Sequence, residues 1–131
     1  MPIRFIVRGI CCLKPGLPAI SHRIRVVSVI GRFLEHSRAW LFGNGGDTEV
    51  YISSADWMPR NLDRRIEAAV PLESPGHREV VRQQLDLIWT DNRQAWDLAA
   101  DGSWTQRVPH EDKEIATHRA LIEWYRVMRT E

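Results

Sequence analysis

Two strands and a tight turn are predicted by the central stretch Arg38-Ala-Trp-Leu-Phe-Gly43-Asn-Gly-Gly-Asp-Thr48-Glu-Val-Tyr-Ile-Ser53. Apolar and aromatic residues dominate 38–42 and 49–53, while Asn-Gly and Gly-Gly between them supply the positive φ angles that a hairpin turn needs. If the two strands pair antiparallel, the start of the first lies beside the end of the second. We therefore expect this hairpin to gather the polar residues that flank it.

Polar residues occur at both ends that the hairpin would bring together. His36 and Arg38 precede the first strand, and Ser53 and Ser54 open a polar stretch that follows the second. A lone histidine is more often a surface or structural residue than a catalyst. An imidazole among guanidinium groups and hydroxyls is nevertheless suited to a phosphoryl group, because forked donors meet its charge while the histidine moves a proton. The cluster is our candidate phosphate site.

Residues 22–34 are open to two interpretations. The β-branched content favours a strand, but Val26, Ile30 and Phe33 fall at the i, i+4, i+7 positions of a helix, for which Ser21 is a suitable N-cap. We prefer the helix. The other patterns predict strands at 4–7 and 65–70, a helix from Ser74-Pro75, a small hairpin within 94–108, and a last helix from near Glu111. This order indicates an α/β fold with a mixed sheet and flanking helices.

Composition restricts the class of protein. The chain has 131 residues, enough for one modest domain, and its 44% hydrophobic and 27% charged residues are ordinary for a globular protein. It contains no apolar run near the ~18 residues of a membrane span. The two cysteines, Cys11 and Cys12, are adjacent and cannot join distant segments. We expect a soluble intracellular domain.

The net charge of the chain is +1, but its charged residues are unevenly distributed along the sequence. Residues 1–38 carry seven basic side chains and one acid, whereas residues 66–131 carry eight basic side chains and twelve acids. Arginine outnumbers lysine sixteen to two. A GC-rich genome would produce that ratio without any function, and so would selection for a site that binds phosphates or carboxylates through guanidinium forks. The positions of the arginines decide between the two explanations.

Four blocks of sequence carry a family resemblance: Val7-Arg8-Gly-Ile-Cys11, Gly31-Arg-Phe-Leu-Glu-His36-Ser-Arg38, Phe42-Gly-Asn-Gly-Gly46, and Ser54-Ala-Asp-Trp-Met-Pro-Arg60-Asn-Leu-Asp-Arg-Arg65. They resemble the C-terminal part of polyphosphate kinases, which end in a domain with the phospholipase-D-like fold. The resemblance covers essentially all 131 residues. It extends to the His-x-Lys signature of the wider superfamily, with Arg38 in place of the lysine and Ser54-Ala55-Asp56 in place of an asparagine loop.

The resemblance implies a reaction and an incomplete site. Polyphosphate kinases reversibly move the terminal phosphate of ATP onto inorganic polyphosphate through a phosphohistidine, with magnesium, at a site between two similar half-domains. The phosphorylated histidine is followed there by Pro-Tyr, which this chain lacks. We therefore expect residues 1–131 to be a single domain, the second half-site of a longer enzyme, inactive when isolated. The partners implied are ATP or ADP, polyphosphate and the other domains of the same enzyme.

The resemblance also implies site residues. The residue matching His36 contacts the nucleotide and is a candidate acid or base, and the residue matching Arg8 binds the nucleotide phosphates. Arg38 and Arg60 would line a basic tunnel for the polyanion. Magnesium would be held mainly by other domains, so no metal ligand is proposed in this chain. The full-length enzyme is expected to be a homo-oligomer in the cytoplasm, with membrane association left open, and no nucleic acid partner is expected.

Two other interpretations of the residues stay open. One is a small phospholipase-D-like phosphodiesterase or nuclease that dimerises to pair two copies of His36, although the arginine at position 38 and the Asp56-Trp57-Met58 loop argue against it. The other is a non-enzymatic module that binds polyanions through the basic first third of the chain, with steep salt dependence.

Overall fold

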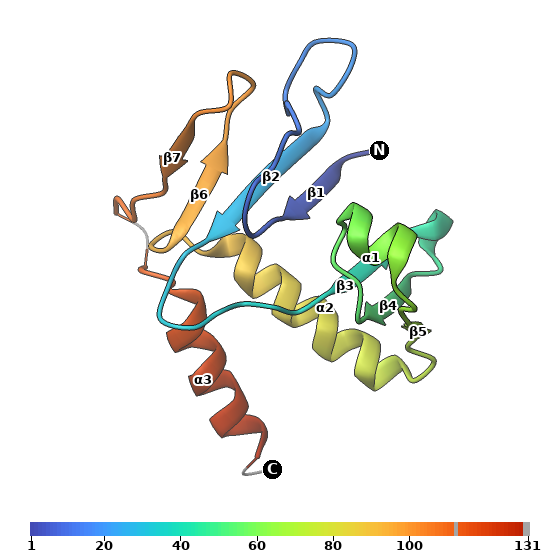
Figure 1. Ribbon diagram of the computed structural model, residues 1–131. Helices are drawn as coiled ribbons and strands as arrows, with labels where there is room; N and C mark the ends of the chain where they lie inside the picture. The colour runs from blue at the N-terminus through green and yellow to red at the C-terminus, as the bar shows by residue number, and fades with distance from the viewer. Residues whose placement is uncertain (112, 130–131) are drawn as a thin grey trace. The chain divides into compact units, whose positions relative to one another are not determined.

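The computed structural model describes residues 1–111 and 113–129 (Figure 1). The chain divides into two compact units, one formed by Met1–Glu35 with Asp86–Glu131 and the other by His36–Leu85. The boundary between Leu85 and Asp86 falls within helix α2, Pro75–Thr90, which begins where Ser74-Pro75 predicts it. Within the described ranges, none of the helices is long and apolar enough to cross a membrane.

The first unit contains a four-stranded mixed sheet in the order β1-β2-β6-β7 (Figure 1). Its strands are β1 (Ile3–Ile6), β2 (Ile24–Val29), β6 (Ala95–Leu98) and β7 (Trp104–Gln106). Strands β1 and β2 are parallel, and β6 pairs antiparallel with both β2 and β7. Val27, Val29, Ile88 and Ala95 form the core of this sheet, and the partly buried Ile6 and Trp89 pack against them.

The predicted helix over 22–34 is wrong, because residues 24–29 form strand β2. This strand lies between two neighbours, and Val26, Val27, Ser28 and Val29 are all buried. Burial on both faces removes the alternation that marks a half-exposed strand, so the helical spacing of its apolar residues is misleading. Ser21 is not a helix cap either, since its hydroxyl donates to the Lys14 carbonyl at 2.5 Å within a turn.

The second unit contains the hairpin predicted from the central stretch. Strands β3 (Ala39–Phe42) and β4 (Glu49–Ser53) pair antiparallel, with Ala39 opposite Ile52 and Phe42 opposite Glu49. Their connection includes a short 3-10 turn, Asn44–Gly46, in which Gly45 and Gly46 have φ angles of 67° and 114°. These angles require glycine, as the sequence predicts. Strand β5 (Ala69–Pro71) adds to β4 and is shorter than expected.

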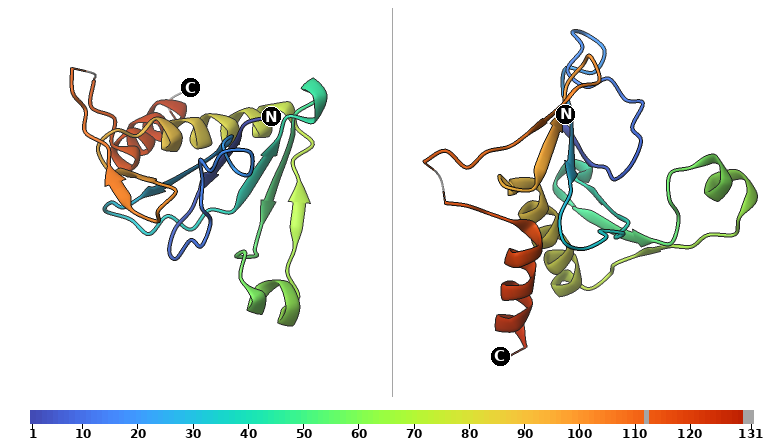
Figure 2. Two further views of the ribbon diagram at one scale, coloured as in Figure 1. Left: turned by 90° about the horizontal axis from the view of Figure 1, so that it is seen from above. Right: turned by 60° about the vertical axis from the view of Figure 1, so that its left-hand side comes forward.

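Two further elements of the structure differ from the prediction. The polar stretch after β4, for which the sequence predicts no helix, contains a short helix α1, Pro59–Arg64, at the tip of the excursion between β4 and β5 (Figure 2). The last helix, α3, is Thr117–Met128 rather than beginning near Glu111. Position 112 of the predicted start lies outside the described residues. The backbone N–H of Thr117 donates to the carboxylate of Asp91 at 2.6 Å, which provides a cap from a distant part of the chain.

Candidate phosphate-binding site

The β3–β4 hairpin brings the segment 36–38 beside the start of the polar loop. Arg38 immediately precedes β3, and its carbonyl accepts a hydrogen bond from the N–H of Ser53, the last residue of β4, at 2.9 Å. Asp56 follows Ser53 by three residues. The antiparallel register therefore places Asp56, from the far side of the turn, next to Arg38 and His36.

Arg38 links the other two side chains of this cluster. Its Nε donates to Asp56 Oδ1 at 2.8 Å, and its terminal nitrogen NH2 approaches His36 Nε2 at 2.8 Å. The same carboxylate oxygen lies 3.6 Å from His36 Nε2. The His36 side chain is 58% exposed, whereas those of Arg38 and Asp56 are 23% and 28% exposed. The imidazole is thus accessible at the surface, and the ion pair that supports it is more protected.

The charges of the cluster reinforce one another. The hydrogen bond from Arg38 is the main reason that the pKa of Asp56 lies below its ordinary value, and the charges of Arg38, His36 and Arg60 add to this effect against partial burial. The same hydrogen bond raises the pKa of Arg38. Asp56 and Arg38 therefore stay ionised together. Arg60, on α1, lies close enough for its charge to act on Asp56.

A second carboxylate, Glu67, braces the loop that carries Asp56. Glu67 accepts hydrogen bonds from the Ser54 hydroxyl at 2.5 Å and from the buried amide of Asn61 at 2.7 Å. The Ser54 hydroxyl in turn accepts the N–H of Ala68 at 3.1 Å. The hydrogen bonds from Ser54 and Asn61 lower the pKa of Glu67, so this carboxylate stays ionised. The two ends of the excursion between β4 and β5 are held together by this network.

Trp57 lies in the same loop with 68% of its surface exposed. Its ring makes an edge-to-face contact with Trp40 of β3, with the centroids 6.1 Å apart. This contact agrees with a supporting role for Trp57 in the loop.

The four residues predicted for the site do not all fall in one unit. His36, Arg38 and Arg60 belong to the second unit and surround Asp56, as described above. Arg8 belongs to the first unit, where it follows β1, and its NH1 donates to the carbonyl of Glu35 at 3.5 Å. The place of Arg8 in a common site with the other three stays a prediction.

The residues of the cluster do not suit magnesium. Among the described residues, no group of three or more histidine, cysteine, aspartate or glutamate side chains is arranged to hold a metal ion. Asp56, the carboxylate within the cluster, already receives Arg38. Magnesium prefers oxygen ligands, whereas guanidinium groups only donate hydrogen bonds. The chemistry that this cluster offers is therefore binding of anions and transfer of a proton at the imidazole.

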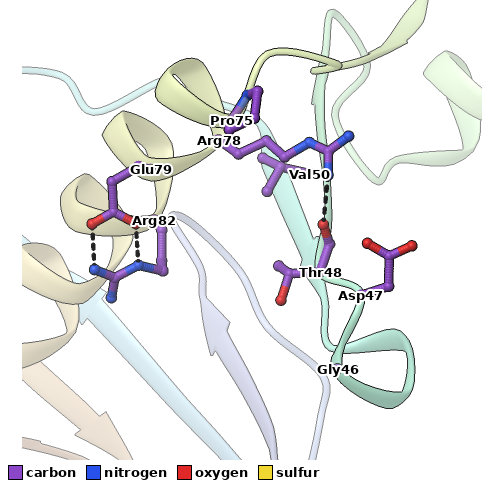
Figure 3. Close-up of a pocket in the computed structure, with 8 residues that line it drawn as sticks. All are labelled: Gly46, Asp47, Thr48, Val50, Pro75, Arg78, Glu79 and Arg82. Carbon is purple, nitrogen blue, oxygen red and sulfur yellow. Dashed lines mark hydrogen bonds and ion pairs between the residues drawn. The ribbon is translucent and has the colours of Figure 1, made fainter.

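Two shallow pockets are lined by residues other than those of the cluster. The first, about 280 Å³, is in the second unit between the hairpin turn and the start of α2. Arg78 there donates to the carbonyl of Thr48 at 3.3 Å. Figure 3 shows this contact and the pairing of Glu79 with Arg82. The second, about 350 Å³, lies in the first unit between residues 33–35 and α3. Neither pocket contains a residue predicted for the site.

The sequence indicated no role for Asp56 or Glu67. Both lie in the polar stretch after β4, and the structure shows that one holds Arg38 and the other holds the loop. The available signal was the hairpin register, which places the residues after Ser53 beside Arg38. That register does not determine which of the polar residues there faces the guanidinium.

Comparisons with known proteins agree on one family. A family model described as "Polyphosphate kinase C-terminal domain 2" matches residues 1–118. The chain is 54% identical over 121 residues to a protein of Thermosynechococcus vestitus named polyphosphate kinase, which covers 92% of this chain and 16% of that protein. It is also 54% identical over 107 residues to the polyphosphate kinase of Pseudomonas aeruginosa, covering 82% of this chain and 16% of the relative.

A solved structure gives the same result for the fold. The crystal structure of the polyphosphate kinase from Porphyromonas gingivalis superimposes on this chain with a TM-score of 0.92 at 39% identity. The match covers 97% of this chain and 19% of that one. The chain thus spans less than a fifth of the length of these relatives.

Proposed function

The chain belongs to the polyphosphate kinase family, of which it is a C-terminal domain, and we propose that it supplies one half of the catalytic site of such an enzyme. The reaction is the reversible transfer of the terminal phosphate of ATP to inorganic polyphosphate. The phosphohistidine intermediate would lie in the other half of the site, outside this chain. The single observation that carries the proposal is Arg38, held by Asp56 and directed at His36 on the accessible side of the hairpin.

Each residue of the cluster has a distinct part in this proposal. Arg38 and Arg60 neutralise the charge of the phosphoryl groups and direct forked donors at their oxygens. His36 contacts the nucleotide and exchanges a proton with it. Arg8 binds the nucleotide phosphates, as the family resemblance implies. Because the phosphorylated histidine is supplied from outside this chain, 131 residues alone should not turn over substrate.

The partners follow from the same assignment. ATP, ADP and polyphosphate are the proposed ligands, and the remaining domains of the enzyme are the proposed partners of this chain. Magnesium would enter on the nucleotide or be held by those domains. We also propose that the complete enzyme is a homo-oligomer in the cytoplasm.

Equilibrium binding to the complete enzyme tests the proposal. Tryptophan fluorescence is titrated with polyphosphate of medium length, with ATP, and with single-stranded DNA of equal charge as polyphosphate, at low and moderate salt. The unmodified enzyme is expected to bind polyphosphate and ATP more tightly than DNA. Arg38→Ala should weaken polyphosphate binding and Arg8→Ala should weaken ATP binding, each by about 10-fold or more, since each removes a charge-assisted hydrogen bond.

Matched controls separate a site from a generally basic surface. Arg25→Ala removes an exposed arginine of β2 from the same basic third of the chain and should leave both affinities unchanged. If all three variants weaken polyphosphate and DNA equally, binding is due to diffuse charge, and the proposal fails in favour of a non-specific polyanion module.

A further inference from the structure

We propose that Asp56 is a positioning residue, which fixes the direction of the Arg38 guanidinium and holds it beside the imidazole of His36. The inference rests on the proposed function, because it assigns a task within the same site. It concerns a residue that the sequence left without a role.

The first step is the geometry of Arg38. A guanidinium group is planar and only donates, so fixing one N–H fixes the direction of the others. Asp56 takes the Nε–H at 2.8 Å, and this leaves NH2 directed at His36. A free arginine side chain has many rotamers, and selecting one of them costs conformational entropy. Because the Asp56 carboxylate already holds Arg38 in one rotamer, that entropy is not lost again when a phosphate binds.

The second step concerns the contact between Arg38 and His36. The NH2 of Arg38 lies 2.8 Å from Nε2 and 3.4 Å from Nδ1 of the imidazole, so the guanidinium stands beside the ring. Asp56 Oδ1 lies 3.6 Å from the same Nε2. A guanidinium that Asp56 no longer held would therefore be free to leave the imidazole as well.

The third step is that Asp56 is itself held in place. The loop before it is anchored where the N–H of the buried Ala55 donates to the Ser53 hydroxyl at 3.0 Å. The loop after it is closed by Glu67, which binds Ser54 and Asn61. The charged groups that act on Asp56 are Arg38, His36 and Arg60, and all three are basic. Asp56 is thus a carboxylate fixed within a basic cluster. It can therefore hold the Arg38 guanidinium, the donor of the phosphate site, in one orientation.

A double-mutant cycle in the complete enzyme tests the inference. Polyphosphate synthesis from ATP is measured for Arg38→Ala, Asp56→Ala and the double variant. A residue that acts through Arg38 has no further effect once Arg38 is absent. We expect each single variant to lose about 100-fold in kcat/KM, and the double variant to be no worse than Arg38→Ala. If Asp56→Ala lowers kcat/KM by the same factor in both backgrounds, Asp56 acts independently of Arg38 and the inference is wrong.

Two further variants serve as controls, one for the loss of any carboxylate from this loop and one for a failure to fold. Asp63→Ala removes an exposed carboxylate on α1 of the same loop and should leave kcat/KM unchanged. Asp56→Asn removes the charge but keeps an oxygen that accepts from Nε, so it should retain more activity than Asp56→Ala. The cycle can therefore be run with Asp56→Asn if Asp56→Ala does not fold. If Asp56→Asn is no more active than a folded Asp56→Ala variant, Asp56 does not position Arg38 through this hydrogen bond.

The ring of His36 gives a readout that does not depend on activity. In ¹⁵N-histidine-labelled protein, the His36 signals are assigned by their loss in His36→Gln. They should move in Asp56→Ala, because the guanidinium that Asp56 holds beside the ring is released, and they should stay in place in Asp63→Ala. Unmoved His36 signals in Asp56→Ala would overturn the inference. If Arg38→Ala and His36→Gln both keep full activity, the proposed function fails instead, and the ring signals still decide on positioning.

Discussion

The carboxylate of Asp91 accepts both the backbone N–H and the hydroxyl of Thr117, at 2.6 and 2.7 Å, across 26 positions of sequence. Its other oxygen accepts three successive backbone N–H groups, those of Arg93, Gln94 and Ala95, at 2.6 to 2.9 Å. Asp91 and Thr117 are both completely buried. One side chain thereby closes the turn before β6 and caps the first residue of α3.

Replacement of Asp91 by alanine should be strongly destabilising. It leaves five donors without their acceptor. Three of them, the N–H of Ala95 and the N–H and hydroxyl of Thr117, are buried, and each unsatisfied buried group costs about 1–3 kcal/mol unless water reaches it. We expect Asp91→Ala to lower the free energy of unfolding by about 3 kcal/mol or more, measured by urea denaturation. Asp63→Ala is the matched control and should stay near the original value. A loss for Asp91→Ala as small as for Asp63→Ala would show that the network is not needed.

Acid should weaken the same network. Burial alone would raise the pKa of Asp91, but the hydrogen bonds from Thr117 and from the N–H groups of Gln94 and Arg93 outweigh it and lower the pKa. A carboxylate with a depressed pKa stabilises the fold above its unfolded pKa, about 3.9, and loses that contribution as pH falls through the folded value. Unfolding by urea between about pH 5 and pH 2 should therefore show a smaller loss of stability in Asp91→Asn than in the unmodified chain. If the free energy of unfolding falls equally with pH in both proteins, this prediction is wrong.

The start of α3 could not be predicted from its own sequence for the same reason. Ala116 stands at the N-cap and offers no side-chain hydrogen bond, so local rules favour an earlier start in the acidic segment from Glu111. The cap comes instead from Asp91, which only the folded chain brings into contact with Thr117. The hairpin after Arg38 was predictable because its turn glycines lie next to the strands that they connect.

Burial explains the wrong prediction at β2, and strand pairing explains why His36 and Arg38 could be placed beside the polar loop. Val26 and Val27 are covered on both sides by neighbours distant in sequence, so their spacing carries no information on the strand. The position of His36 and Arg38 beside the polar loop could be predicted, because antiparallel pairing puts the start of β3 next to the end of β4. The orientation of Asp56 toward Arg38 depends on the loop brace at Glu67, which no local pattern encodes.

Gly31 is expected to tolerate no side chain, although it is itself exposed. A Cβ added there would lie 2.5 Å from Nδ1 of the buried His118 and would also meet the side chain of Gln94. His118 Nδ1 accepts the N–H of Phe33 at 3.3 Å, so moving the ring costs a hydrogen bond. Gly31→Ala should lower the free energy of unfolding by about 1–3 kcal/mol in urea denaturation.

Gly76 provides the control for this substitution. It lies in the first turn of α2, where an added Cβ meets only the Ser74 hydroxyl at 3.8 Å. Gly76→Ala should be neutral or stabilising by up to about 1 kcal/mol, because alanine loses less backbone entropy in a helix. If Gly31→Ala is as stable as Gly76→Ala, the segment around His118 is free to rearrange and the close packing described here is not required.

Lysine should not replace arginine at position 38. A lysine ammonium keeps the charge but lacks the rigid fork by which Arg38 contacts Asp56 and His36 simultaneously. In the complete enzyme, Arg38→Lys should lower kcat/KM for polyphosphate synthesis by about 10-fold or more. Arg23→Lys, at an exposed residue that donates to the neighbouring His22, should not change it. Full activity in Arg38→Lys would mean that charge alone is sufficient at this position.

We propose above that His36 belongs to the catalytic site of a polyphosphate kinase. The most direct measurement is the rate of ATP-dependent polyphosphate synthesis by the complete enzyme carrying His36→Gln, beside His77→Gln, which changes an exposed histidine on α2. We expect His36→Gln to fold normally and to lose at least about 100-fold in rate, because it removes a general acid or base. We expect His77→Gln to retain its rate. A His36→Gln enzyme that synthesises polyphosphate as fast as His77→Gln would contradict the claim.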